Sequence, residues 1–195
     1  MNLLIVGSGA REHAFAWKIY NSSFRAKIFV TNANPGTIEI ANSLKLDIND
    51  FKSVKHAILN NSISMVLIGP EIPLINGVCD FIKSDPDLLN VHVIGPSRAG
   101  SQLEGSKEFA KEFMIRHAIP TASYKSFTKS TYNNAVNFIN ENNPPFVLKA
   151  DGPAAGKGVI IIDNKKDAII NLKELSLIHI SEPTRRRGIG VGGVW

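Results

Sequence analysis

Apolar and polar positions alternate in a regular way along the first hundred residues. Phe51, Val54 and Ile58 recur at the spacing of one helix face, so residues 51–60 are predicted to form a helix with Asp50 as its N-cap. The same pattern predicts two further helices, over residues 11–20 and 74–83. Four short apolar runs are predicted to be strands: residues 3–6, 28–30, 65–68 and 91–94. Because strands and helices alternate, we expect a parallel sheet with right-handed crossovers.

A second pattern begins near residue 104. Ser106 is a good N-cap for a helix over residues 107–117 that would bury Phe109, Phe113 and Met114. A strand over 123–127, a helix over 132–140 and strands over 146–148 and 159–162 are expected to follow. The predicted fold class is therefore α/β: a Rossmann-like parallel-sheet domain over residues 1–103, followed by a small α+β unit over residues 104–174.

Each strand of the predicted parallel sheet is followed by a loop that contains glycine. In an open α/β sheet these loops lie along the edge where ligands bind. Glycine lets backbone N–H groups approach an anion closely, so four such loops indicate a small anionic ligand. The loops begin at Gly7, Thr31, Gly69 and Gly95, and they include Gly9, Gly36, Pro70 and Glu71.

The first loop does not match a dinucleotide site. Glu12 stands where the third small residue is needed, and Thr31 stands after the second strand where an acidic residue would bind a ribose. A phosphate at the N-terminus of the following helix remains consistent with the sequence, with Arg11 and His13 as donors. The sequence equally allows a capping or packing role for His13. Glu71 is either a ligand contact or a carboxylate favoured by the helix dipole.

The second unit contains a glycine-rich loop between two lysines. Lys149 precedes Gly152, and Lys157 lies between Gly156 and Gly158. The loop joins two predicted strands and lacks the spacing and the helix of a Walker loop. We therefore interpret it as a flap over nucleotide phosphates, the alternative being an ordinary hairpin with solvated lysines. Lys107, at the start of a helix, is a candidate for the same nucleotide, or else a solvated residue.

Composition narrows the class of protein. The 195 residues carry a formal charge of +5, but three arginines lie at 185–187, and residues 1–174 alone carry +3. No basic stripe with interleaved aromatic residues is present, which argues against nucleic acid as a partner. No apolar run has the length of a membrane span. The single cysteine, Cys79, excludes a disulfide within the chain and is expected to be buried. We therefore expect a cytoplasmic protein.

Four stretches resemble, in order, phosphoribosylamine–glycine ligases of the ATP-grasp superfamily. The stretches are Gly7-Ser8-Gly9-Ala10-Arg11-Glu12-His13-Ala14, Gly69-Pro70-Glu71-Ile72-Pro73-Leu74, Gln102-Leu103-Glu104-Gly105-Ser106-Lys107 and the run from Lys149 to Val159. The resemblance covers residues 1–170 and is specific because four motifs occur in sequence. It implies a pre-ATP-grasp domain followed by the start of an ATP-grasp domain.

The resemblance also implies an activity and a set of binding residues. ATP would phosphorylate glycine, and the amine of phosphoribosylamine would attack the glycyl phosphate, giving glycinamide ribonucleotide, ADP and phosphate. No catalytic side chain is required. The nucleotide would contact Lys107, Lys149, Asp151, Gly152, Gly156, Lys157 and Gly158. The sugar phosphate would contact Gly7, Gly9, Arg11, Glu12, His13, Gly36, Pro70 and Glu71.

Members of this family are more than twice as long as the present chain. The carboxylates for Mg²⁺ (or Mn²⁺) and the glycine site are therefore expected beyond its end, and the chain alone is expected to be an inactive monomer. The partners would be small molecules: phosphoribosylamine, glycine and ATP. Another ATP-grasp ligase, acting on a purine precursor or biotin, is one alternative. A phosphate- or nucleotide-binding module without chemistry is the other.

The last 21 residues differ from the rest. Residues 175–195 resemble an in-frame translation of a sequencing-library adapter followed by read-through, the alternative being a natural strand, turn and basic tail. We expect this segment to be non-native and to take no settled place in the fold.

Overall fold

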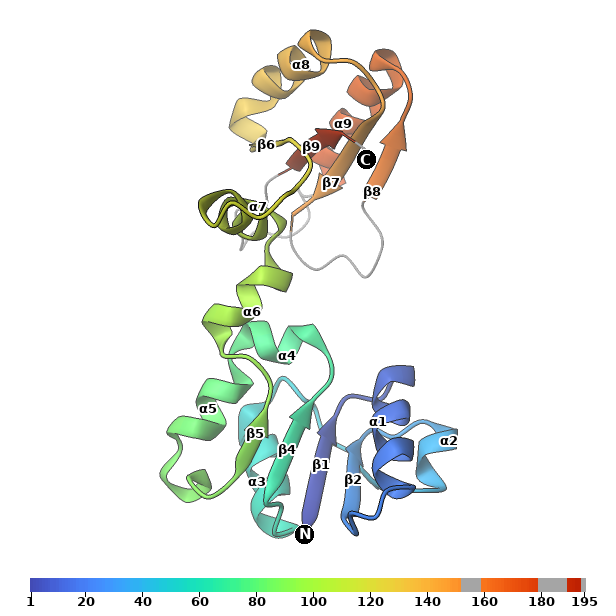
Figure 1. Cartoon of the computed structure of the whole chain (residues 1–195), viewed down its shortest axis with the longest axis vertical. Coiled ribbons are helices and arrows are strands. Elements are labelled where there is room, and N and C mark those ends of the chain that lie inside the picture. Colours follow the sequence, from blue (N-terminus) through green and yellow to red (C-terminus); the bar gives the residue numbers. More distant parts are fainter. Residues whose placement is uncertain (152–158, 179–188, 194–195) are drawn as a thin grey trace. The chain divides into compact units, whose positions relative to one another are not determined.

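The computed structural model describes residues 1–151, 159–178 and 189–193, with side chains described up to Leu175 in the last helix. The chain forms two compact units, Met1–Ser101 and Gln102–Trp195. Each unit has its own sheet and its own core (Figure 1).

The first unit is built on a five-stranded sheet in which every strand pair is parallel. The strand order is β3-β2-β1-β4-β5. The register places Leu4 of the central strand opposite Phe29 on one side and Val66 on the other. The strands are β1 (Asn2–Val6), β2 (Lys27–Thr31), β3 (Asn42–Leu44), β4 (Met65–Ile68) and β5 (His92–Ile94). This confirms the predicted α/β class with a parallel sheet.

Helices cover both faces of this sheet (Figure 1). Leu3 and Ile5 of β1 pack with Ala16 of α1 on one face, whereas Leu4 and Val6 join a larger core with α3, α4 and α5 on the other. This follows from strand geometry, since successive side chains point to opposite faces. The helices are α1 (Ala10–Tyr20), α2 (Pro35–Ile38), α3 (Phe51–Asn60), α4 (Glu71–Asn76), α5 (Val78–Ser84), the 3₁₀ helix η1 (Pro86–Leu88) and α6 (Arg98–Gly105), which contains the boundary between the units.

Several details of the first unit differ from the sequence prediction, which included neither η1 nor α6. The helix expected over residues 74–83 is two helices, because Gly77 adopts φ +96° and ends α4 by donating its N–H to the carbonyls of Pro73 and Leu74. The short elements β3 and α2 carry no periodic apolar pattern and were not predicted. The Asp50 cap is confirmed, since its carboxylate accepts from the backbone N–H of Lys52.

The second unit has a four-stranded sheet in the order β6-β9-β7-β8, with antiparallel pairs throughout. The strands are β6 (Tyr124–Phe127), β7 (Phe146–Ala150), β8 (Val159–Ile162) and β9 (Ile189–Gly193). The helices are α7 (Lys107–Arg116), the 3₁₀ helix η2 (Lys129–Thr131), α8 (Tyr132–Glu141) and α9 (Lys165–Ile178). Its core joins Phe127, Ile139, Leu148 and Leu172, so α8 and α9 pack on the sheet.

The burial predicted for α7 is wrong. Phe109, Phe113 and Met114 are half-buried, and α7 has no buried residue. The ring of Phe113 instead packs against residues at the C-terminal end of α7. Its centroid lies 4.3 Å from that of the His117 ring, and the Arg116 guanidinium lies over it. The helix therefore lies outside the α8–α9 core.

The expectation that residues 175–195 take no settled place is wrong for two parts of that segment. Leu175 is buried because it continues the inward face of α9 formed by Ala168 and Leu172. Strand β9 pairs with β6 on one side and β7 on the other. Backbone pairing needs no particular side chains, which is why a glycine-rich sequence can occupy a sheet. The adapter origin of the segment stays a prediction.

Candidate functional site at the carboxyl edge of the parallel sheet

The first loop of the candidate site is fixed by a buried threonine. Gly7 follows β1 with φ +119°, a left-handed conformation that glycine adopts readily. Its N–H donates to the Thr31 hydroxyl at 2.7 Å, and that hydroxyl donates to the Gly7 carbonyl at 3.3 Å. Thr31, at the end of β2, is therefore a structural partner of the loop. This explains why an uncharged residue occupies the position where a dinucleotide site carries an acid.

Glu12 turns inward and supports the same loop. Its side chain is buried, and its carboxylate accepts from the N–H of Gly9, the N-cap of α1, at 2.6 Å. A Cβ atom at Gly7 would lie 2.7 Å from Glu12, and one at Gly69 would overlap its carboxyl group. Glu12 stands where a dinucleotide site has a small residue, and Gly69 in the third loop leaves the space that the Glu12 carboxyl group occupies. A carboxylate at this helix N-terminus is also favoured by the helix dipole.

Arg11 and Pro70 bring the third loop to the first. The Arg11 guanidinium donates to the carbonyl of Gly69, so it positions backbone. Pro70 is the N-cap of α4, and its ring lies against Gly7, where a Cβ would come within 2.9 Å. Glu71 is the first residue of α4 and is half-buried. The fourth loop packs elsewhere, since Gly95 lies against Cys79 and Leu74.

The second loop meets the first through contacts that join five residues. The Asn34 amide donates to the Ser8 carbonyl at 3.0 Å, and the His13 ring Nδ1 lies 3.0 Å from the Thr37 hydroxyl. Gly36 sits beside the His13 ring, where a Cβ would be 3.3 Å from Cε1. The structure therefore brings the predicted residues of three loops together. Sequence reasoning missed Asn34 and Thr37, although Asn before Pro with Thr three positions on is an N-cap pattern that could have revealed them.

In the second unit, Asp151 is bound to the start of α7. Its carboxylate accepts from the Lys107 N–H at 2.6 Å and from the Ser106 hydroxyl at 3.2 Å. The Ser106 hydroxyl in turn accepts from the N–H of Phe109, which confirms the predicted cap. The helix N-terminus at which a nucleotide phosphate was expected is therefore occupied by a carboxylate of the chain itself.

Lys149 lies on β7, half-buried, opposite Val159 and Gly190 in the two neighbouring strands. Burial, together with the positive charge of Lys149, lowers the pKa of Lys111 on α7. Lys111 donates to the Thr121 hydroxyl and to the Ala122 carbonyl, and it lies over the Tyr124 ring. Lys111 was not predicted as part of the site. The second lysine of the predicted flap, Lys157, lies outside the described residues, as do Gly152, Gly156 and Gly158.

Within the described ranges, no group of three His, Cys, Asp or Glu side chains could hold a metal ion. The described helices include none that is long and apolar enough to cross a membrane. Burial raises the pKa of the Cys79 thiol, in keeping with its predicted place in the core.

Comparison with known proteins gives matches over both units. Residues 1–104 match the family model of the phosphoribosylglycinamide synthetase N domain, and residues 105–179 match the ATP-grasp (A) domain of the same synthetase. A phosphoribosylamine–glycine ligase of Pasteurella multocida is 40% identical over 177 residues, which are 90% of this chain and 40% of that protein. A trifunctional purine biosynthetic protein of Chironomus tentans is 40% identical over 181 residues, 89% of this chain and 12% of its own length.

Solved structures agree with these matches. The phosphoribosylamine–glycine ligase of Thermotoga maritima has a TM-score of 0.71 at 26% identity, covering 100% of this chain and 44% of that one. An N5-carboxyaminoimidazole synthetase from Staphylococcus aureus, solved with ADP, has a TM-score of 0.70 at 16% identity, covering 99% and 47%, and shows the fold alone. The chain spans about 40% of the length of the Pasteurella relative. With two family models matched in order from residue 1 to residue 179, the chain belongs to the phosphoribosylglycinamide synthetase family.

Proposed function

We propose that this chain is the N-terminal part of an ATP-dependent ligase that joins glycine to 5-phosphoribosylamine. The products would be glycinamide ribonucleotide, ADP and phosphate, formed through a glycyl phosphate. The observation that carries the proposal is the order of the two family matches over residues 1–179. The convergence of the first three loops on Gly7–Gly9 supports it, because that edge is where an open α/β sheet binds its ligand.

The first unit would hold the sugar phosphate. Arg11 and Glu12 would act by holding the loop backbones in place, since both side chains are bound to backbone groups of the loops. His13, beside Gly36, would meet the ligand directly, together with Pro70, Glu71 and the Cα of Gly9, whose N–H and carbonyl are bound to Glu12 and to the His13 N–H. This division follows from the contacts of each side chain.

The second unit would begin the nucleotide site. Lys107, Lys149 and Lys157 would neutralise the phosphates of ATP, and the loop over residues 152–158 would cover them. Asp151 would act on the nucleotide only through α7, whose first N–H groups it binds. No protein nucleophile is needed, because positioning and cationic stabilisation of the transferring phosphoryl group supply the catalysis. Mg²⁺ (or Mn²⁺) would be held by carboxylates in the remaining part of a full-length member, and the working protein would be a cytoplasmic monomer.

The test is a chimaera. Residues 1–178 would be joined to the complementary C-terminal part of the Pasteurella multocida relative, and ADP release would be measured with and without glycine and phosphoribosylamine. We expect the chimaera to release ADP only with both substrates, and the chain alone to release none. The Lys149→Met chimaera should lose the activity, while the Lys166→Met chimaera, changed at an exposed position of α9, should keep it. A folded chimaera that binds ATP without turnover would contradict the proposal and favour a binding module.

A further inference from the structure

We propose that Thr37, with Asn34, is a positioning residue that keeps the proton of the neutral His13 ring on Nδ1 and leaves Nε2 to meet the ligand. The identity of the ligand, a sugar phosphate, rests on the function proposed above. The tautomer of the His13 ring does not depend on that function. Thr37 has an exposed fraction of 1% and lies in α2, on the loop that follows β2.

The first step is the orientation of the Asn34 side chain. Its Nδ2 donates to the Ser8 carbonyl at 3.0 Å, which turns Oδ1 toward α2. Oδ1 there accepts from the Thr37 N–H at 3.0 Å. Because a carbonyl oxygen only accepts and an amide nitrogen only donates, these two bonds define which end of the amide faces Thr37.

The second step concerns which atom accepts the single proton of the Thr37 hydroxyl. Oγ1 lies 3.0 Å from Asn34 Oδ1 and 3.0 Å from His13 Nδ1. Oδ1 has no proton to give, so the hydroxyl donates to it and offers a lone pair to His13. Nδ1 must then carry a proton for this contact to be a hydrogen bond. The tautomer of a histidine is set in this way by the bond that one ring nitrogen makes.

The third step concerns the other ring nitrogen. Among the residues that the structure describes, Nε2 of His13 has no hydrogen-bond partner. Gly36 lies beside the ring, where a Cβ atom would come within 3.3 Å of Cε1, so a larger side chain would force the ring to shift. The ring is therefore bonded at Nδ1, while Nε2 has no hydrogen bond to the described residues. All proton exchange with a hydroxyl, amine or phosphate of the ligand then takes place at Nε2.

The experiment is long-range ¹H–¹⁵N correlation NMR of the whole chain labelled at histidine nitrogens. The His13→Gln variant assigns the resonance. We expect a protonated Nδ1 and an unprotonated Nε2 in the neutral ring. Thr37→Val should release the ring toward the Nε2–H form, whereas Thr37→Ser should keep the original pattern. Asn34→Ala should also produce Nε2–H, because the Thr37 hydroxyl is then free to donate to Nδ1.

Ribose 5-phosphate, added to the same sample, tests the ligand side. Binding of ribose 5-phosphate should change the ¹⁵N chemical shift of Nε2 more than that of Nδ1. Thr37→Val should lower the affinity for ribose 5-phosphate about three- to tenfold, the value of one hydrogen bond. An Nε2–H tautomer in the unaltered chain, or an unchanged tautomer in folded Thr37→Val, overturns the proposal. Binding that leaves the His13 nitrogens unmoved also overturns it. If the tautomers behave as expected and ribose 5-phosphate does not bind, the proposed function fails and the role of Thr37 in setting the tautomer stands.

Discussion

The carboxyl group of Glu12 lies against Gly69 so closely that a Cβ atom at Gly69 would overlap it. Two loops that follow neighbouring strands, β1 and β4, are thereby packed on one another. Glu12 is buried and bound to the N–H of Gly9, so it cannot move aside without breaking a hydrogen bond.

Gly69→Ala is therefore expected to destabilise the first unit by about 1–3 kcal/mol, the usual cost of overpacking. Urea unfolding of the two proteins measures it. Gly100→Ala is the matched control, because a Cβ there meets only ordinary contacts in α6. Alanine in a helix should be neutral or up to about 1 kcal/mol stabilising. In a Glu12→Ala background the cost of Gly69→Ala should largely disappear, and a fully additive double variant would contradict the contact.

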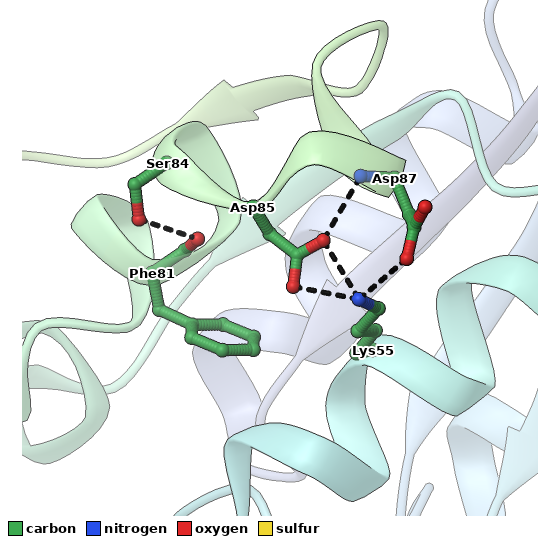
Figure 2. A network of polar contacts seen from close by, with 5 residues as sticks. All are labelled: Lys55, Phe81, Ser84, Asp85 and Asp87. Carbon is green, nitrogen blue, oxygen red and sulfur yellow. Dashed lines mark hydrogen bonds and ion pairs between the residues drawn. The ribbon is translucent and has the colours of Figure 1, made fainter.

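A second prediction concerns Lys55, which joins α3 to η1 (Figure 2). Its ammonium lies 2.8 Å from Asp85 and 2.7 Å from Asp87. The hydrogen bond from Lys55 lowers the pKa of the Asp85 carboxyl below its ordinary value, and the bonds to Asp85 and Asp87 raise the pKa of Lys55. The Asp85 contribution to stability is therefore present above about pH 4, the unfolded pKa, and lost as pH falls through the lower folded value. The Lys55 contribution is lost only as pH rises above about 10.4.

Asp85→Asn is expected to flatten the acid part of the curve of unfolding free energy against pH. Lys55→Met is expected to flatten both the acid part and the alkaline part of this curve. Unfolding in urea from pH 3 to pH 7 measures the acid part. Lys45→Met, at an exposed position after β3, is the control and should keep the slope of the unaltered chain. An Asp85→Asn curve parallel to that of the unaltered chain would show that the ion pair contributes nothing measurable.

The sequence predicted well what local chemistry decides. Asp50 and Ser106 were identified as N-caps because a cap needs only its own side chain and the next two or three N–H groups. The parallel sheet followed from alternating strands and helices. The break at Gly77 was missed because the apolar pattern continues through it, and β3 was missed because its few residues carry no alternation.

The site shows the same division. Loops that follow the strands of a parallel sheet lie along one edge, and this alone predicted that the loops of Gly7 and Gly69 lie together. The pairing of His13 with Thr37 joins residues 24 positions apart, and the packing of Glu12 on Gly69 joins two different loops. Such pairs depend on the register of neighbouring strands, which a periodic pattern does not define to the residue. The sequence therefore predicted which loops lie together and not the side-chain contacts that hold them.

A third prediction separates a capping role of Asp151 from a role as a ligand contact alone. Its carboxylate binds the Lys107 N–H and the Ser106 hydroxyl, so Asp151→Ala should speed hydrogen exchange at the first amides of α7 without any nucleotide present. Ser106→Ala should lower the free energy of unfolding by about 1 kcal/mol, as for other N-caps. Asp163→Ala, at an exposed position after β8, is the control. Unchanged exchange at Lys107 and Glu108 in Asp151→Ala would leave Asp151 with no part in the cap.

The fourth prediction concerns β9, which lies between β6 and β7 and gives both an antiparallel partner. Residues in the middle of a sheet pair on both sides, so the amides of Val191 and Gly192 should exchange much more slowly than those of an unfolded chain. Deleting residues 189–193 would leave the facing edges of β6 and β7 unpaired, and exposed strand edges favour association between chains. We therefore expect the shortened chain to unfold at lower urea and to form dimers or larger species in light scattering. Exchange of the β9 amides at the unfolded rate, with an unchanged unfolding midpoint after deletion, would instead indicate that the segment is the foreign tail that its sequence resembles.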